Sequence, residues 1–284
     1  MYASILLLAV AVGADAGHAC FKQSDHRDEV VTSPRPHEYL ASPPASLDYR
    51  DYEGRAWTSL SRNQHIPNYC GACWSFAATS ALDDRIRLAR GKTASRQVDL
   101  AMQVILNCDT YDDGCHGGDP LTAYKFVHEH RLPEETCQLY EAVGRDTGKK
   151  CDAIDVCRNC DPDAGCSAQK NYMTYGVSEY GLVNGTAEMM AEVAARGPIA
   201  CTVAVTPALE AFNGSGVFVD TTGDTSMDHS ISVVGYGFDA ASNLDYWIVR
   251  NSWGTYWGDK GYFKLVLLRR FFIFTSPART TPAR

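Results

Sequence analysis

The sequence predicts an α+β fold with a helical half followed by a sheet half. Between residues 73 and 196, apolar residues recur mostly at helical spacing, whereas after residue 198 they gather in short runs typical of strands. Helices that precede strands in this way favour two packed halves. The 284 residues also suffice for one large or two small domains with a hydrophobic core.

Composition and charge exclude several classes of protein. The chain is 45% hydrophobic and 21% charged, which is ordinary for a globular protein. Its formal net charge of −8 argues against nucleic acid as a partner. No apolar run reaches the roughly 18 residues of a membrane-spanning helix.

The N-terminal region is typical of a secretory precursor. Residues 5–12 are apolar and precede a small-x-small site, Ala-Asp-Ala, at 14–16, so we expect a signal peptide over residues 1–16. The polar, proline-containing residues 17–42 predict a short pro-segment. The globular domain is expected over 43–267, in a protein of the lysosome or the extracellular space.

The longest helix is predicted over Cys73–Arg90, because its apolar residues follow a helical period and Gly91 is a suitable stop. This prediction puts Cys73 at a helix N-terminus. Shorter helices are expected over Leu100–Leu106, Leu121–His130 and Glu188–Arg196.

The rest of the chain is predicted to contain loops and strands. Residues 131–170 are rich in Cys, Asp and Gly, and we expect loops held by disulfides. Strands are expected over Ile199–Val205, His229–Tyr236, Tyr246–Arg250 and Gly261–Leu267. Residues 268–284 match neither half and are interpreted as a divergent C-terminal tail.

The cysteines support passage through an oxidising compartment. All eleven follow the predicted signal peptide, and seven lie between Cys108 and Cys166, a density that predicts a disulfide framework. Asn184 and Asn213 begin Asn-Gly-Thr and Asn-Gly-Ser sequons, so both are predicted glycosylation sites.

Four residues suggest covalent catalysis by a thiol. Cys73 is the candidate nucleophile, because a helix N-terminus and an imidazolium both favour the thiolate. His229 is the candidate base, and Asn251 would orient its imidazole through the side-chain oxygen, under cover of Trp253. Gln64 and the backbone amide of Cys73 would donate to the oxyanion.

Each residue alone has a simpler interpretation. Cys73 could be a structural half-cystine, His229 a core histidine bonded to a carbonyl, and Asn251 a turn residue. Their flanking sequences and their order along the chain favour catalysis.

The flanking motifs resemble those of the papain-like cysteine proteases. Cys70-Gly71-Ala72-Cys73-Trp74 matches the signature C-G-[SA]-C-[WY]. The other similar blocks are Cys115–Gly118, Asp228–His229, Gly235–Gly237 and Asn251–Gly258. The resemblance covers about residues 46–267.

This resemblance implies a two-domain fold with a helical left half, a β-sheet or barrel right half and the active-site cleft between them. It implies that Gly117, Gly118 and Trp253 bind substrate. We expect no cofactor, no metal, and a monomer that acts on peptides and proteins.

Within the family, the chain most resembles the cathepsin X (cathepsin Z) branch. An insertion, His65-Ile66-Pro67, separates Gln64 from the signature, and the pro-segment is short with one cysteine. The resemblance implies a carboxypeptidase that removes mainly single C-terminal residues. Pro67 would stiffen a loop that blocks the primed side of the cleft, and protonated His65 would bind the free carboxylate of peptide and protein C-termini.

The resemblance also implies how the cysteines pair. Cys20 of the pro-segment would bond to Cys73 and hold the enzyme inactive as its own inhibitor. The remaining implied pairs are Cys70–Cys115, Cys108–Cys151, Cys137–Cys157 and Cys160–Cys166. Cys201 is left over, because its family partner lies in a C-terminal stretch that this sequence replaces. We therefore expect a missing disulfide and a missing strand at the sheet edge.

Four other functions agree with parts of the sequence. A papain-like endopeptidase is the nearest alternative, and a catalytically impaired binding form would follow if the altered C-terminus disabled the enzyme. A thiol-disulfide oxidoreductase using Cys70-x-x-Cys73 fails because no thioredoxin-like unit surrounds the motif. A zinc module using Cys157-x-x-Cys160 lacks a second pair at suitable spacing.

Overall fold

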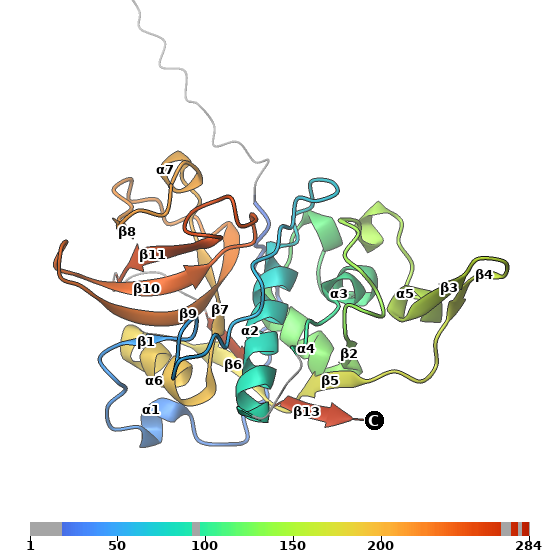
Figure 1. Cartoon of the computed structure of the whole chain (residues 1–284), viewed down its shortest axis with the longest axis horizontal. Coiled ribbons are helices and arrows are strands. Elements are labelled where there is room, and N and C mark those ends of the chain that lie inside the picture. Colours follow the sequence, from blue (N-terminus) through green and yellow to red (C-terminus); the bar gives the residue numbers. More distant parts are fainter. Residues whose placement is uncertain (1–18, 93–96, 268–273, 278–279, 284) are drawn as a thin grey trace, which may run out of the picture.

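The computed structural model describes residues 19–92, 97–267, 274–277 and 280–283. Helices gather in one half of the molecule and a twisted sheet forms the other, with α2 (Cys73–Arg90) between them (Figure 1). The predicted signal peptide lies outside the described residues. Within the described ranges, no helix is long and apolar enough to cross a membrane.

The helical half is built around α2. This helix packs against α3 (Met102–Cys108) and α4 (Pro120–His130) in one apolar core. It ends at Gly91, whose φ of 69° suits glycine. α4 begins at Pro120 because the Asp119 side chain accepts a hydrogen bond from Leu121 N. These predicted helices are confirmed, although α3 begins two residues later than expected.

The sheet half is mainly antiparallel. Its strands run in the order β6-β12-β7-β9-β10-β11-β8, where β12 is Phe274–Pro277, and β8 pairs in parallel with β11. The bounds are β1 (Leu47–Asp48), β6 (Tyr180–Val183), β7 (Ile199–Val203), β8 (Val217–Phe218), β9 (His229–Asp239), β10 (Leu244–Arg250) and β11 (Tyr262–Val266). The same half contains two helices, α6 (Thr186–Arg196) and α7 (Pro207–Glu210). The short strand β1 pairs with β9. The four predicted strands are confirmed, with β9 three residues longer.

The cysteine-rich region is more ordered than predicted. It contains α5 (Ala153–Val156) and an exposed hairpin of β3 (Arg158–Asp161) and β4 (Gly165–Ala168), which projects from the helical half (Figure 1). The expectation of loops alone is therefore wrong here. Both faces of this hairpin are exposed over most of its length, so no apolar alternation marks it in the sequence. The other short elements are α1 (Pro36–Tyr39), η1 (Gly114–His116), β2 (Leu132–Pro133), η2 (Arg145–Thr147) and β5 (Thr174–Val177).

The expected gap at the sheet edge is not found. β12 (Phe274–Pro277) pairs antiparallel with β6 along four residues and meets β7 at Thr275 and Ala200. β13 (Thr280–Ala283) pairs with β5. The prediction was wrong because a sheet edge binds extended backbone through its N–H and C=O groups, whatever the side chains. The tail therefore joins the fold with a sequence unlike that of the family.

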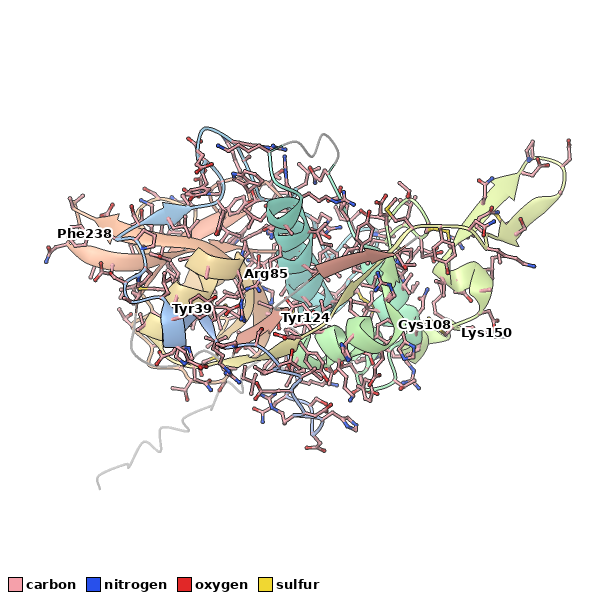
Figure 2. All side chains as sticks on the ribbon, turned by 90° about the horizontal axis from the view of Figure 1, so that it is seen from below. Tyr39, Arg85, Cys108, Tyr124, Lys150 and Phe238 are labelled. Atoms are coloured by element: carbon pink, nitrogen blue, oxygen red, sulfur yellow. A yellow bond between two sulfur atoms is a disulfide. The ribbon has the colours of Figure 1, made fainter. Side chains whose placement is uncertain are left out.

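Buried ionic groups attach α2 to the sheet half. Arg250 at the end of β10 donates to Asp84 of α2 at 2.7 Å, and it also bonds Ser59. Arg85 donates to Glu192 of α6 at 3.1 Å, while the Tyr124 hydroxyl of α4 donates to a carbonyl of α2 at 3.2 Å (Figure 2). These contacts connect α2 with both halves.

Asp84→Ala should destabilise the protein strongly. Burial raises the pKa of Asp84, and the neighbouring Arg250 opposes that rise. Removing the carboxylate would leave Arg250 buried without its partner, at a cost of about 3–5 kcal/mol. Urea unfolding of both proteins measures this difference.

Lys92→Ala is the control, because it removes an exposed ion pair with Glu53 that spans 2.7 Å. Its cost should stay below about 1 kcal/mol. Equal effects of the two substitutions would show that the buried pair has no special role.

Candidate active site

The fold brings four distant residues together. Cys73 is the first residue of α2, His229 is the first of β9, and Asn251 follows β10 directly. Gln64 lies in the segment before α2, where its backbone N–H donates to Ser252 O at 2.9 Å. All four predicted catalytic side chains are buried.

The imidazole of His229 is held on two sides. Its Nε2 lies 2.7 Å from Asn251 Oδ1, which also accepts a hydrogen bond from Ser252 N. Because the amide oxygen only accepts, Nε2 is the protonated nitrogen of the neutral ring. The Trp253 ring lies 4.9 Å from the imidazole and tilts by 30° over it. These contacts leave Nδ1 facing sulfur.

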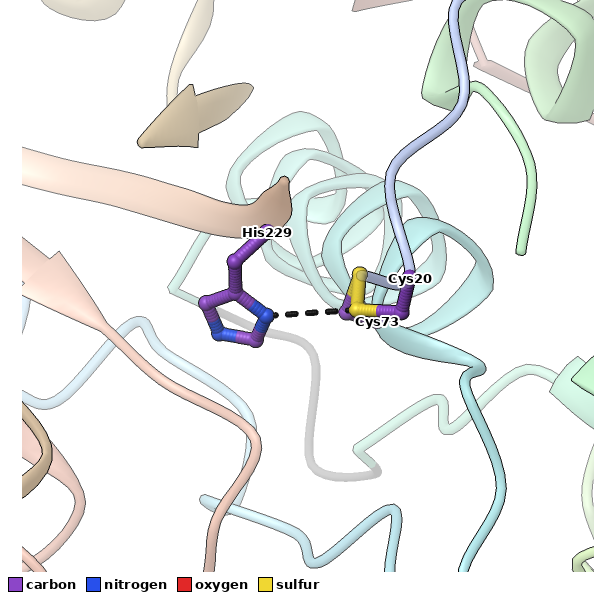
Figure 3. A group of neighbouring side chains, drawn as sticks. All are labelled: Cys20, Cys73 and His229. Carbon is purple, nitrogen blue, oxygen red and sulfur yellow. Dashed lines mark hydrogen bonds between the residues drawn. A yellow bond between two sulfur atoms is a disulfide. The ribbon is translucent and has the colours of Figure 1, made fainter. Parts of the chain in front are cut away.

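The sulfur opposite this ring belongs to a disulfide. Cys20 and Cys73 are bonded, with Cα atoms 5.8 Å apart, and Cys20 Sγ lies 3.3 Å from His229 Nδ1 (Figure 3). The backbone N–H groups of Cys20 and Phe21 both donate to Asp228 O at 2.8 Å. In this state Cys73 has no thiol to ionise.

The two glycines assigned to substrate binding lie beside the same N-terminal segment, since a Cβ added at Gly117 would lie 3.1 Å from Cys20 O. Gly118 N donates to Cys20 O at 3.1 Å, and Lys22 N donates to Gly118 O at 3.0 Å. A Cβ at Gly118 would lie 2.6 Å from the Trp74 ring, so the position requires glycine. Residues 20–22 therefore occupy the backbone hydrogen bonds that Gly118 would otherwise offer.

Gln64 is oriented by three contacts. Its Oε1 accepts from the Ser252 hydroxyl at 2.6 Å, and its backbone oxygen accepts from the Tyr140 hydroxyl at 2.6 Å. Its Nε2 donates to Cys70 O at 3.0 Å and lies 3.9 Å from Cys20 Sγ. One N–H of the amide thus bonds Cys70 O, and the other points toward the Cys20 sulfur.

A cavity of about 230 Å³ adjoins the disulfide. Its lining residues are Cys20, Gln64, His65, Glu210, His229, Trp253, Tyr256 and Trp257. His65 is partly exposed and stacks on Tyr69 at 4.9 Å. Sequence reasoning did not identify Glu210 or Tyr256 as lining residues, because neither lies at a recognised catalytic position and no local signal marks them.

One cluster among the described residues has the spacing of a metal site. The ligand atoms of Cys20, Cys73 and His229 lie within 4.8 Å of one another. Because the two sulfurs are bonded to each other, neither offers a thiolate to a metal ion.

The five disulfides are the pairs implied by the family resemblance. Besides Cys20–Cys73, they are Cys70–Cys115, Cys108–Cys151, Cys137–Cys157 and Cys160–Cys166. Cys201 of β7 is buried and free, as expected. Asn184 and Asn213 are both exposed, so each sequon is accessible to glycosylation.

A cysteine, a histidine and an asparagine in a cleft between a helical half and a sheet define the class of papain-like thiol proteases. The chain belongs to the papain family of cysteine proteases, whose sequence model matches residues 43–270. It is 41% identical over 253 residues to cathepsin Z of Onchocerca volvulus, covering 88% of this chain and 80% of that protein.

Solved structures show the same fold. Digestive procathepsin L2 from Tenebrio molitor superposes with a TM-score of 0.71 at 25% identity, over 93% of this chain and 79% of that one. Bromelain from Ananas comosus, in complex with the E64 inhibitor, has a TM-score of 0.64 at 27% identity, over 83% and 99%.

The titration of His229 should depend on the disulfide. Burial lowers the pKa of His229 to about 4, an effect that outweighs the bond to Asn251. Reduction would create a Cys73 thiolate, whose charge favours the imidazolium and raises this pKa. NMR titration of the His229 ring should therefore give a midpoint near pH 4 before reduction and a higher one after it.

The same shift makes stability depend on pH. In the disulfide-bonded form, unfolded His229 binds a proton below about pH 6.5 but the folded residue does so only near pH 4. The contribution of His229 to the free energy of unfolding is therefore complete above pH 6.5 and falls as the pH drops to 4. A His229 midpoint that is the same before and after reduction would contradict the first expectation, and a free energy of unfolding that does not fall between pH 6.5 and 4 would contradict the second.

Proposed function

We propose that the chain is the precursor of a cysteine carboxypeptidase that removes mainly single C-terminal residues. The observation that carries the proposal is the position of the His65–Pro67 insertion. His65 lines the same cavity as His229 and Gln64, directly beside the disulfide. A loop there leaves room for about one residue beyond the scissile bond.

The proposed chemistry uses the four predicted catalytic residues. After reduction, the Cys73 thiolate attacks the carbonyl carbon of the last peptide bond, and Gln64 Nε2 and Cys73 N stabilise the oxyanion. His229 then protonates the leaving amine while Asn251 holds its ring. Water, deprotonated by His229, cleaves the thioester and releases the shortened peptide.

The substrate is proposed to be bound on both sides of Cys73. Gly118 offers backbone hydrogen bonds once residues 20–22 leave, Gly117 lies next to it, and Trp253 shields the His229–Asn251 bond. Protonated His65 binds the free carboxylate of peptide and protein C-termini by a charge-assisted hydrogen bond. The enzyme needs no cofactor and acts as a monomer.

Residues 17–42 are proposed to act as an inhibitory pro-segment ahead of a peptidase domain at 43–267. The Cys20–Cys73 bond removes the nucleophile, and ion pairs hold the segment in place. Arg27 bonds buried Asp119 at 2.7 Å, and Lys125 bonds Asp28 at 2.6 Å. Disulfides and accessible sequons support a lysosomal or extracellular protein.

His65→Ala should remove the preference for free C-termini. We expect the ratio of kcat/KM for a free-acid peptide to that for its C-terminal amide to fall about 10- to 100-fold, the worth of a hydrogen bond to a charged group. His130→Ala, at the exposed last residue of α4, is the control and should leave the ratio unchanged. Equal cleavage of acid and amide by the parent protein would favour the endopeptidase alternative.

Cys20→Ser should make activity independent of reductant. The variant keeps the ion pairs of the pro-segment but leaves Cys73 free to react with a thiol-directed active-site inhibitor. Replacing both Cys160 and Cys166 by Ser, which removes an exposed disulfide, is the control and should still require reduction.

A peptide map of the non-reduced precursor tests the bond directly. Cys73 found free or paired elsewhere would refute the proposed latency. Failure of the reduced protein to react with the inhibitor would instead support the impaired binding form.

A further inference from the structure

One acidic residue among those that line the cavity beside the disulfide is not used by the proposed chemistry. Glu210, the last residue of α7, lines the cavity together with His65 and the aromatic side chains. Its backbone oxygen accepts a hydrogen bond from Trp257 Nε1 at 2.9 Å. Within the described part of the chain, no salt bridge neutralises its carboxylate.

Three aromatic residues, Trp253, Tyr256 and Trp257, line the same cavity as Glu210. Trp257 is held by edge contacts with Trp253 at 5.1 Å and with Phe263 at 5.3 Å. Tyr256 is 81% exposed, and its hydroxyl accepts from Asn63 Nδ2 at 3.3 Å. The faces of such rings attract cations. The packed Trp253–Trp257 pair and the Glu210 carboxylate therefore both favour a positively charged ligand.

The charge of Glu210 affects a neighbouring acidic group, Asp228. Burial is the main cause that raises the pKa of Asp228, and the charges of Asp224 and then Glu210 add smaller contributions. The backbone oxygen of Asp228 binds the N–H groups of Cys20 and Phe21 beside the disulfide. The Glu210 carboxylate thus adds negative charge on the side of the cavity near Asp228.

We propose that this cavity binds the side chain of the substrate's C-terminal residue and that Glu210 makes it select lysine or arginine. The inference rests on the carboxypeptidase function proposed above. His65 would hold the terminal carboxylate, and the cationic end of the side chain would lie between Glu210 and the Trp253–Trp257 wall. A cavity of about 230 Å³ is several times the roughly 30 Å³ of one water molecule, so a long side chain can displace solvent there.

The test compares two peptide acids that differ only in charge at the last residue. One ends in lysine and the other in norleucine, and kcat/KM is measured for the full chain after reduction with dithiothreitol. We expect lysine to be preferred about fivefold, the worth of an ion pair that stays partly in water. The preference should shrink between 50 and 500 mM salt because added ions screen the pair.

Glu210→Gln should bring the lysine-to-norleucine ratio close to one. Asp163→Asn is the matched control, because it changes the net charge equally at the exposed tip of the β3–β4 hairpin, and it should leave the ratio unchanged. A parent ratio near one, or a ratio that Glu210→Gln does not alter, overturns the inference. Loss of discrimination between free and amidated termini would instead refute the carboxypeptidase proposal, so the two failures are distinguishable.

A binding measurement tests the selectivity of the cavity even if the chain shows no catalytic activity. The cavity is present while the disulfide is intact, so the oxidised chain can be titrated with Nα-acetyl-lysine and Nα-acetyl-norleucine by NMR. Lysine should bind about fivefold more tightly, and Glu210→Gln should abolish the difference. Equal binding of the two ligands by the parent chain contradicts the proposal.

Discussion

The placement of α2 is the constraint on which the rest of the structure depends. This helix carries Cys73 at its N-terminus, and the buried Asp84–Arg250 pair joins it to the strand that precedes Asn251. Two buried charges tolerate little separation, since each is costly to leave unpaired. The pair therefore fixes α2 against the end of β10. Because Cys73 begins the same rigid helix and Asn251 directly follows β10, it also fixes the sulfur relative to the amide that orients His229.

Much of the site could be predicted from the sequence because its residues sit in local patterns. Cys73 follows Cys70-Gly71-Ala72 and is the first residue of a long stretch with helical apolar spacing. His229 begins an apolar run that becomes β9. Such elements are recognisable without tertiary information. Their ends were less predictable, as the extension of β9 to Asp239 shows, because hydrogen bonding to β10 rather than side-chain pattern decides where that strand stops.

The features that could not be predicted depend on backbone pairing or on chance proximity. The exposed β3–β4 hairpin has no buried face, and β12 enters the sheet through main-chain pairing with β6. Glu210 is the last residue of the short helix α7, and only folding brings it to the cavity that His65 lines. For such residues the sequence holds no periodic or motif signal, so a structure is needed to find them.

Latency and recognition involve different atoms in this molecule. The disulfide engages the sulfur of Cys73, and residues 20–22 occupy the hydrogen bonds of Gly118, yet the cavity lined by His65 and Glu210 stays open. Under the proposed mechanism, reduction would therefore free the nucleophile without rebuilding the pocket for the leaving residue. A pocket formed before activation spares the enzyme the free energy of ordering those side chains when substrate binds. Specificity would then be determined by the folded precursor and only the chemistry by its redox state.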